Sequence, residues 1–213
     1  MIQIFEGAQW ANGLPILDGM YRDRKKIFVD LLGWDVPVVD GAYEIDQFDD
    51  EHAIYVVATN EKGEHEGSIR LLPSRRPHVL GSIFPELCDG AIPVGENVFE
   101  LSRACLSPRN RAARRLQVRN AVTTAVVEFA LLRGIDRFTC IADSGWLSQI
   151  LSLGWDCRPL GLPRDIAGLN TGRWLSKSTA IRPTNCGQQA HMCPCASSMP
   201  TLTAALRREG DTS

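Results

Sequence analysis

Phe99-Glu100-Leu101-Ser102-Arg103-Ala104-Cys105-Leu106 is the stretch of this sequence that decides the fold. Turn-forming residues 93–97 precede it and Ser107-Pro108 follows it, so its length is that of one central strand. Charges inside such an apolar run are seldom buried unless they pair or bind a ligand. We interpret the run as a core strand that carries a site, although the run alone would equally allow a structural ion pair between Glu100 and Arg103.

The spacing of these two charges predicts an irregular strand. Glu100 and Arg103 are three residues apart, and side chains alternate between the two faces of a strand, so a regular strand would point them in opposite directions. A bulge would bring both to one face. We therefore expect the strand to be bulged between them.

Upstream of this strand, the sequence predicts a helix followed by an antiparallel hairpin. Residues 16–32 have the apolar spacing of one helical face, and Gly33 stands just past their end. Residues 53–59 and 65–72 are typical of strands, and residues 60–63 form the turn between them. Residues 42–51 contain five acids, a composition that is normally typical of a solvated turn.

Downstream, helices and strands alternate. Residues 116–132 predict a long helix that Gly134 ends, residues 138–142 a buried strand and residues 146–153 a helix. Residues 158–162 and 173–181 are candidate last strands. This order predicts an α/β fold, a three-layer sandwich with a mixed, mainly antiparallel central sheet flanked by helices.

Composition narrows the domain organisation and the partners. The 213 residues suit one domain, residues 1–183, with a flexible cysteine-containing tail, residues 184–213. A net charge of -2 gives no polycation signature, so we expect no nucleic-acid partner. Neither a leader nor an apolar run long enough to cross a bilayer is recognisable, so we expect a cytoplasmic protein without a membrane partner.

The cysteines do not predict a metal site. Four of the seven stand singly in apolar stretches and suggest reduced core thiols. In the tail, Cys186, His191, Cys193 and Cys195 lie close together, but their spacing matches structural zinc sites poorly. We expect no bound metal.

Several charged and aromatic residues form a pattern with fixed gaps. The pattern consists of Arg24-x3-Phe28-x5-Trp34, Glu44-x-Asp46-x2-Asp49, Arg70-Leu71-Leu72-Pro73, Phe84 and Glu100-Leu101-Ser102-Arg103. In this order and spacing, these residues resemble the signature of the acyl-homoserine-lactone synthases, the autoinducer synthases of quorum sensing. Each element is weak alone, but together they make the resemblance specific over about residues 20–160.

The resemblance implies an acetyltransferase-like fold and a two-step reaction on S-adenosylmethionine. The amine of that substrate attacks the thioester of an acyl carrier, and its carboxylate then displaces the sulfonium to close a lactone, leaving methylthioadenosine. S-adenosylmethionine is a substrate, so no cofactor is expected. The reaction needs a base, groups that hold a cationic zwitterion and a donor to the thioester oxyanion, but no serine or cysteine nucleophile.

The resemblance also implies roles for individual residues. We assign catalysis to Glu100, acting as the base through a water, and to Asp46 and Arg103. Binding of S-adenosylmethionine is assigned to six residues: Arg24, Phe28, Trp34, Asp46, Asp49 and Arg70. In this assignment the acids meet the ammonium or sulfonium, Arg70 and Arg103 keep them ionised, Arg24 binds the carboxylate at the rim of the cleft, and the two rings face the adenine or sulfonium.

The acyl group and its carrier are assigned to two further regions. Phe84, Cys140 and Trp146 are expected to line the acyl pocket, and the large Trp146 ring predicts a short, branched or aromatic acyl group. Where other acetyltransferases have a glycine-rich turn, this chain has five arginines within residues 109–119. We expect Arg109, Arg111, Arg114 and Arg115 to dock an acidic acyl carrier protein, with acyl-coenzyme A as a possible donor and a solvated basic helix face as the alternative.

Two other functions remain open at this point. One is an acyl-coenzyme A-dependent N-acyltransferase of the same fold that forms no lactone. The other is a non-catalytic module that binds an acidic partner, which solvent-exposed acids at residues 44–49 would favour. The charged residues could also be a structural cluster that braces the N-terminal helix on the sheet.

Overall fold

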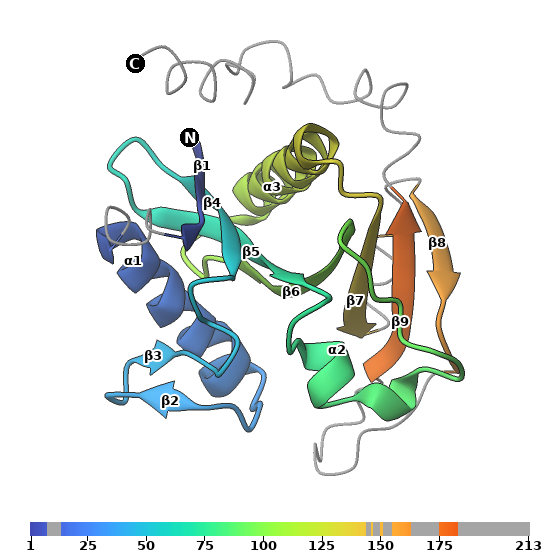
Figure 1. Ribbon diagram of the computed structural model, residues 1–213. Helices are drawn as coiled ribbons and strands as arrows, with labels where there is room; N and C mark the ends of the chain where they lie inside the picture. The colour runs from blue at the N-terminus through green and yellow to red at the C-terminus, as the bar shows by residue number, and fades with distance from the viewer. Residues whose placement is uncertain (8–13, 144–145, 147–149, 151–154, 163–174, 183–213) are drawn as a thin grey trace.

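The computed structural model describes residues 1–7, 14–143, 146, 150, 155–162 and 175–182. Within these residues, seven strands form one sheet in the order β1-β4-β5-β6-β7-β9-β8 (Figure 1). The strands are β1 (Ile2–Phe5), β4 (Ile54–Thr59), β5 (His65–Pro73), β6 (Val98–Leu106), β7 (Arg137–Asp143), β8 (Asp156–Pro159) and β9 (Leu175–Arg182). Only the β6–β7 pair is parallel among the described strands, so the mixed, mainly antiparallel sheet is confirmed.

Helices cover both faces of this sheet. They are α1 (Leu14–Arg24), which continues as the π-helical segment η2 (Lys25–Leu31), then α2 (Val79–Ser82), the 3-10 helix η3 (Pro85–Leu87) and α3 (Ala112–Arg133). The long α3 covers one face, and α1 with the small hairpin of β2 (Val38–Val39) and β3 (Tyr43–Glu44) lies on the other (Figure 1). The three layers predicted from the order of elements are therefore present.

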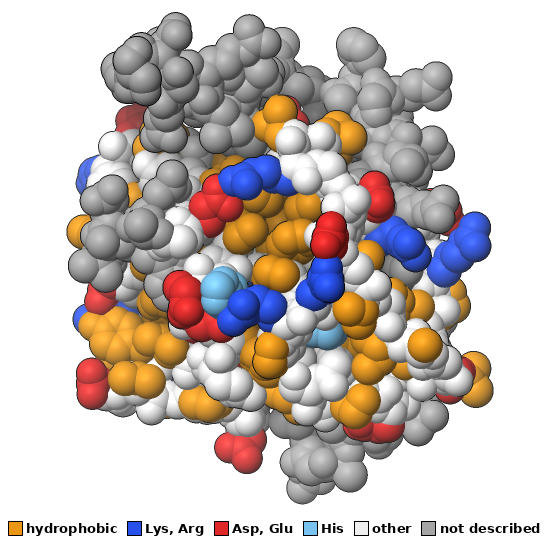
Figure 2. Space-filling model, in the orientation of Figure 1, with side chains coloured by type: hydrophobic (Ala, Val, Ile, Leu, Met, Phe, Trp, Pro, Cys, Tyr) orange, Lys and Arg blue, Asp and Glu red, His pale blue; other side chains and the backbone are white. Residues whose placement is uncertain are grey.

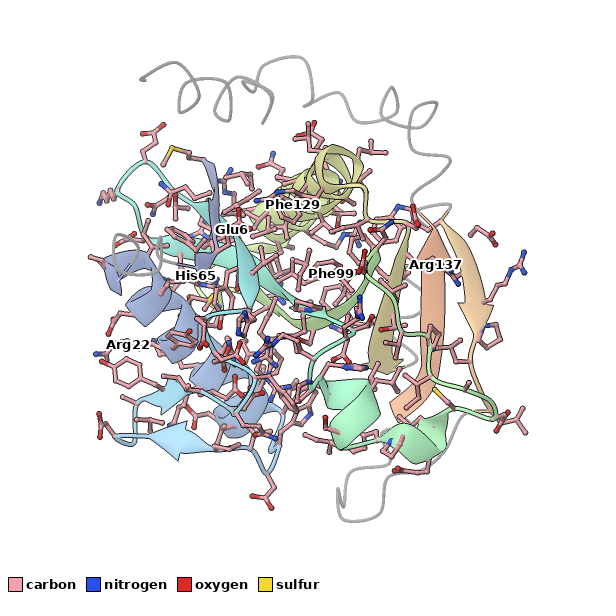
Figure 3. All side chains as sticks on the ribbon, viewed as in Figure 1. Glu6, Arg22, His65, Phe99, Phe129 and Arg137 are labelled. Atoms are coloured by element: carbon pink, nitrogen blue, oxygen red, sulfur yellow. The ribbon has the colours of Figure 1, made fainter. Side chains whose placement is uncertain are left out.

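Each face of the sheet has its own apolar core. Beneath α3, the apolar stripe of the helix, which includes Val122, Val126 and Phe129, packs on Leu101 and Phe138 of the sheet (Figure 3). On the opposite face, α1 packs through Met20 on Tyr55 and Val57 of β4. Burial of a side chain of this kind contributes roughly 1.5–3 kcal/mol, so these two cores fix both layers against the sheet.

Two helix ends lie where the sequence predicts them. Gly33, with φ of 67°, follows the first helix, and Gly134 ends α3 in the left-handed conformation with φ of 64°. Glycine adopts this conformation without the steric cost of a Cβ atom. The π-helical form of residues 25–31 is a difference from the regular helix that periodicity predicts, and π-helical turns are frequent at functional sites.

Other predictions fall outside the description or need correction. The strand β1 is absent from the sequence-based prediction because its few residues carry no clear alternation. Most of the predicted helix at residues 146–153 and the whole tail at residues 184–213, including its cysteines, lie outside the described residues. Among the helices that are described, none combines the length and the apolarity that crossing a bilayer requires.

Surface charge is mixed on the face shown in Figure 2. Blue and red side chains adjoin one another there, with hydrophobic patches between them. This interspersed pattern agrees with the near-neutral net charge of -2.

Candidate active site

A bulge in β6 builds the site. Ser68 of β5 is opposite Cys105 and Arg70 is opposite Ser102, so a single β5 residue faces two residues of β6, Arg103 and Ala104. Arg103 has φ of 51°, which is uncommon for a residue with a side chain. The bulge turns Arg103 to the α1 face, where its partners lie, and the predicted irregularity is confirmed.

Six charged side chains on this face form a closed ring of alternating sign. The ring runs through Arg24, Glu44, Arg103, Asp46, Arg70 and Asp49 and back to Arg24. Arg103 has the most exposed side chain of the six, at 11%. Three cations balance three anions, as burial of charges requires.

Arg24 joins Glu44 and Asp49 in the ring. The Arg24 Nε donates to Glu44 at 2.5 Å, and its two terminal nitrogens donate to the two Asp49 oxygens at 2.8 Å each. The Tyr55 hydroxyl donates to the same Asp49 carboxylate at 2.5 Å. Burial opposes ionisation of Asp49, but Arg24 and Arg70 outweigh it and hold its pKa well below the usual range.

Arg70 and Arg103 meet at Asp46. Arg70 makes two bonds to the Asp46 carboxylate, at 2.6 and 3.0 Å, and donates its Nε to Ser102 at 3.0 Å. Arg103 donates Nη2 to Asp46 at 2.7 Å and Nε to Glu44 at 2.9 Å. Asp46, Asp49, Arg70 and Arg103 therefore converge, as we expect of a site, but in a buried ring of ion pairs and not in an open cleft, and Glu100, which we expect in the same cleft, is not a member of the ring.

One expectation for this region is wrong, one general tendency does not hold, and one ring member is missing from the prediction. Arg24 is 1% exposed and not at the rim, because a buried guanidinium needs all of its donors satisfied. The acid-rich segment is not a solvated turn, since Glu44 is 0% and Asp46 9% exposed. Glu44, which pairs with both Arg24 and Arg103, is not among the predicted site residues. Its position two residues before Asp46 could have indicated that both acids lie on one face.

Phe28 and Trp34 stack on each other beside the ring, with centroids 4.7 Å apart and planes 14° apart. The cation over both rings is Arg103, at 5.7 and 5.9 Å. Arg24 instead lies 5.1 Å from the Tyr21 ring. The two aromatic residues therefore stack on each other at the end of the first helix, and the cation that lies over them comes from β6.

A cavity of about 190 Å³ opens where β6 and β7 separate. Their parallel pairing stops at Leu101 and Cys140, and residues just beyond, including Ser102, Arg103 and Ile141, line the cavity. Of the ring members, only Arg103 is among its described lining residues. The splayed sheet thus places an apolar space directly beside the charged ring.

The walls of the cavity agree in part with the expected acyl pocket. Cys140 and Trp146 line it, together with Ile150 and Trp155. Phe84 does not: it packs instead with the core on the α1 side, because η3 turns it away from the strand separation. Assignment of Phe84 to this cavity is therefore wrong.

Glu100 lies beside the cavity, not in its described wall. Its side chain is on the α1 face and accepts a hydrogen bond from the Leu80 N–H of α2 at 2.8 Å. Burial raises the pKa of this carboxyl, while the Leu80 N–H, His78 and Arg70 oppose the rise. A raised pKa suits a base that works near neutral pH.

The arginines at the start of α3 have different environments. Arg109 makes two bonds to buried Asp23, at 2.7 and 2.8 Å, and Arg114 pairs with Glu66. Asp23 also meets His65, between α1 and the sheet (Figure 3), with 2.8 Å from its Oδ2 to the Nδ1 of His65.

The other two arginines, Arg115 and Arg111, lie in different environments. Arg115 lines the cavity. Arg111 is exposed and has no acidic partner among the described residues. The four residues predicted to dock a carrier are therefore not a uniform basic surface.

Comparison with known proteins gives a consistent result. The family model described as autoinducer synthase matches residues 13–170. An acyl-homoserine-lactone synthase of Ralstonia nicotianae is 34% identical over 150 residues, which are 68% of this chain and 74% of that protein.

Solved structures agree. A coenzyme A-dependent acyl-homoserine lactone synthase, BjaI, solved with S-adenosylmethionine and isopentyl-coenzyme A, has a TM-score of 0.78 and 26% identity over 89% of this chain and 86% of that one. A second coenzyme A-dependent synthase, MesI, has a TM-score of 0.76 and 26% identity over 87% and 90%.

Proposed function

The chain belongs to the autoinducer synthase family, whose members act as acyltransferases, and from this premise we propose that it makes an N-acyl-L-homoserine lactone from S-adenosylmethionine and an acyl thioester. The observation that carries the proposal is the contact between the closed charged ring and the apolar cavity at Arg103. A cationic zwitterion and an acyl chain must meet at such a boundary for the reaction to occur. The proposed products are the lactone, a free thiol and methylthioadenosine.

The first step joins the two substrates. The ammonium group of S-adenosylmethionine gives up a proton, and its nitrogen attacks the thioester carbonyl carbon. The new C–N bond forms and the C–S bond breaks, and the departing thiolate takes up the second proton, which the nitrogen loses as the amide forms. Glu100 is the proposed proton acceptor, because it is the carboxyl on β6 whose pKa burial raises.

The second step closes the lactone. A carboxylate oxygen of the acylated substrate attacks the carbon bonded to the sulfonium, and the C–S⁺ bond breaks to release neutral methylthioadenosine. We assign the orientation of this carboxylate to Arg103, which lines the cavity, and not to Arg24, whose donors bind Glu44 and Asp49. The faces of Phe28 and Trp34 suit the sulfonium, because aromatic rings attract cations.

We propose acyl-coenzyme A as the donor, in place of the acyl carrier protein that the arginine-rich sequence favours. The pairing of Arg109 with Asp23 and of Arg114 with Glu66 leaves little uncompensated positive charge for a large acidic surface. A coenzyme A phosphate needs only a few cations, which Arg111 and Arg115 supply. The similarity to two coenzyme A-dependent synthases supports the same donor.

Mass spectrometry of one reaction tests the function and the donor. The protein is incubated with S-adenosylmethionine and one acyl group, carried either by coenzyme A or by acyl carrier protein. We expect N-acyl-homoserine lactone and methylthioadenosine, with a higher kcat/KM for the coenzyme A donor. An open-chain amide without methylthioadenosine would identify a plain N-acyltransferase, and a higher kcat/KM for the carrier protein would restore the donor predicted from the sequence.

A further inference from the structure

Two buried polar atoms without partners occur close to Glu100. Among the described residues, four buried side-chain atoms have no hydrogen-bond partner: Gln3 Oε1, Thr59 Oγ1, His78 Nε2 and Thr139 Oγ1. The first two belong to the β1 and β4 strands at the other edge of the sheet. Thr139 belongs to β7, which pairs with the strand of Glu100, and His78 immediately precedes α2, whose Leu80 N–H binds the Glu100 carboxyl. A buried unpaired polar group costs about 1–3 kcal/mol, so two at one place call for a reason.

Thr139 lies on the same face of the sheet as Glu100. The two residues are partners in the parallel register of β6 and β7. Their neighbours Leu101, Phe138 and Cys140 belong to the core beneath α3, so alternation puts Glu100 and Thr139 on the opposite face. Thr139 is 0% and Glu100 1% exposed. The hydroxyl and the carboxyl therefore share one buried layer.

His78, the residue just before α2, lies beside this buried layer. It precedes the helix, is 4% exposed, and its Nδ1 lies 2.8 Å from the Arg76 carbonyl oxygen. Because a carbonyl only accepts, Nδ1 carries a hydrogen and the orphan atom is Nε2. Gly81 leaves room for the ring, since a Cβ there would lie 2.7 Å from His78 Cε1. The ring is thus held in one orientation near the turn that Glu100 binds.

The strand geometry separates Glu100 from the cavity. Ser102 and Ile141 line the cavity, and Glu100 and Thr139 lie two residues earlier on the same face of the same strands. Two residues of strand span about 7 Å. Because Glu100 is not among the described lining residues, a substrate proton would reach its carboxyl through a short hydrogen-bonded chain.

We propose that Thr139 and His78 are positioning residues for Glu100, and that they hold the hydrogen-bonded water relay that carries the substrate proton from the cavity to its carboxylate. The Thr139 hydroxyl donates toward the relay or the carboxylate, and His78 Nε2 is the second fixed point. Glu100 ends the step as a carboxylic acid, and the relay is unchanged. This inference rests on the proposed function, in which Glu100 is the base.

The charged and titratable groups that face Glu100 are His78 of α2 and Arg70 of β5. Arg70 is itself bound to Asp46 and Asp49 in the ring, so its position is fixed. His78 favours the ionised carboxylate, and in the proposed arrangement the Thr139 hydroxyl favours it too by donating a hydrogen bond. The pKa of Glu100 is therefore expected to rise further in both variants.

A matched pair of threonine variants tests the inference. Thr139→Val and Thr59→Val remove hydroxyls that are equally buried and equally unpaired, at 0% exposure each. We expect Thr139→Val to lower kcat about 10-fold with little change in either KM, and to move the acidic limb of the pH profile upward. Thr59→Val should leave kcat and the profile unchanged. Equal kcat values for the two variants and the wild type would overturn the role of Thr139.

Two histidine variants test the second fixed point. His78→Asn keeps a donor at the Nδ1 position and removes Nε2, whereas His78→Gln places a polar atom near Nε2. We expect His78→Asn to lower kcat and shift the acidic limb, and His78→Gln to recover part of the loss. A purely structural role would instead lower thermal stability in both without moving the limb, and that result would contradict the proposal for His78.

A titration separates this inference from the proposed function. The ¹³C resonance of the Glu100 carboxyl reports its pKa in the full-length protein even without turnover. A higher Glu100 pKa in Thr139→Val and His78→Asn, but not in Thr59→Val, supports the contacts of Thr139 and His78 with Glu100, whatever reaction the protein catalyses. Unchanged titration would overturn it, whereas failure of the proposed function would show as absent methylthioadenosine in the wild type.

Discussion

The charged ring and the cavity lie side by side, but they are built in opposite ways. In the ring, six charged groups pair with one another and even the most exposed side chain keeps only 11% of its surface accessible. The cavity is lined mainly by apolar side chains, among them Trp146, Ile150 and Trp155, at a point where two strands lose their pairing. The ring holds α1 on the sheet, and the cavity supplies space.

This difference separates stability from specificity. Removing one ring member takes one partner from each of its two buried neighbours and leaves an unbalanced charge, which is costly in a buried place. Removing a cavity side chain changes the shape of a space that a substrate fills. We therefore expect ring variants to affect folding and all substrates alike, and cavity variants to affect substrates selectively.

The largest expected effect is that of Arg24→Met. It removes one of the two ring cations that pair with each of Glu44 and Asp49 and leaves the buried ring with three acids and two cations, and breaking buried pairs in this way costs about 3–5 kcal/mol. Urea denaturation of the variant measures the loss. Arg22→Met, two residues earlier on the same helix, is the control, because its exposed pair with Asp18 should contribute at most about 1 kcal/mol. Equal losses in the free energy of unfolding for the two variants would show that the ion pairs of Arg24 contribute no more than an exposed pair.

Glu100→Gln should lower turnover and raise stability together. The loss of the base should cut kcat about 10²-fold. Burial raises the pKa of Glu100 in the folded state, so the native protein binds more protons than the unfolded chain above the ordinary value of 4.5, and stability falls as pH rises through that window. Removing the charge should therefore raise the melting temperature at pH 7, measured by circular dichroism. Unchanged turnover would move the base elsewhere.

Asp49 should show the opposite dependence on pH. Its folded-state pKa is depressed, so its contribution to stability is complete above the ordinary value of 3.8 and is lost as pH falls through the lowered value. The stability of the wild type should therefore begin to fall as pH drops below 3.8, and Asp49→Asn should flatten this part of the stability profile. An Asp49→Asn profile that keeps the wild-type slope would assign the acid transition to another carboxyl.

Trp146→Ala should change acyl preference more than activity. The variant enlarges the cavity, and each extra methylene that fits should gain about 0.8 kcal/mol of burial, roughly fourfold in relative kcat/KM. A ladder of straight-chain acyl-coenzyme A donors measures the slope. If overall activity falls and the preference keeps its shape, Trp146 is only a packing residue and the expected short, branched or aromatic acyl group loses its basis.

The smallest effect is expected from the start of α3. Arg111→Glu should raise the KM for the donor a few-fold, more at low salt, because exposed charges are screened. The KM for S-adenosylmethionine should stay constant. Arg75→Glu, on an exposed loop pair with Glu96, is the control. If the Arg111 variant changes both KM values equally, the substitution has disturbed the helix and not donor binding.

The ring was more readable from sequence than the cavity. The resemblance to the synthase signature marks Arg24, Asp46, Arg70 and Arg103 as a site, and strand alternation alone predicts the bulge between Glu100 and Arg103. The cavity depends on where β6 and β7 stop pairing, which no local pattern encodes. Because no local pattern shows where the strands separate, the sequence wrongly predicts Phe84 in the cavity wall. It also wrongly predicts the buried Arg24 at the rim of the cleft.

Glu44 of the ring and Tyr55, which binds the ring at Asp49, are missing from the prediction for different physical reasons. Glu44 has the same alternation as Asp46, but a carboxylate in an acid-rich segment is usually solvated. Tyr55 lies in an apolar strand where its ring predicts packing, and nothing in the sequence marks the hydroxyl that reaches Asp49. Contacts of this kind depend on the register between β4 and β5, which the tertiary fold sets.

The central claim is that one turnover uses both the ring and the cavity to couple acyl transfer to lactone closure. The direct test is to measure free thiol and methylthioadenosine together in one reaction of the wild-type protein with S-adenosylmethionine and an acyl-coenzyme A. The account predicts that the two products appear at equal rates and in equal amounts. Thiol released without methylthioadenosine would contradict it.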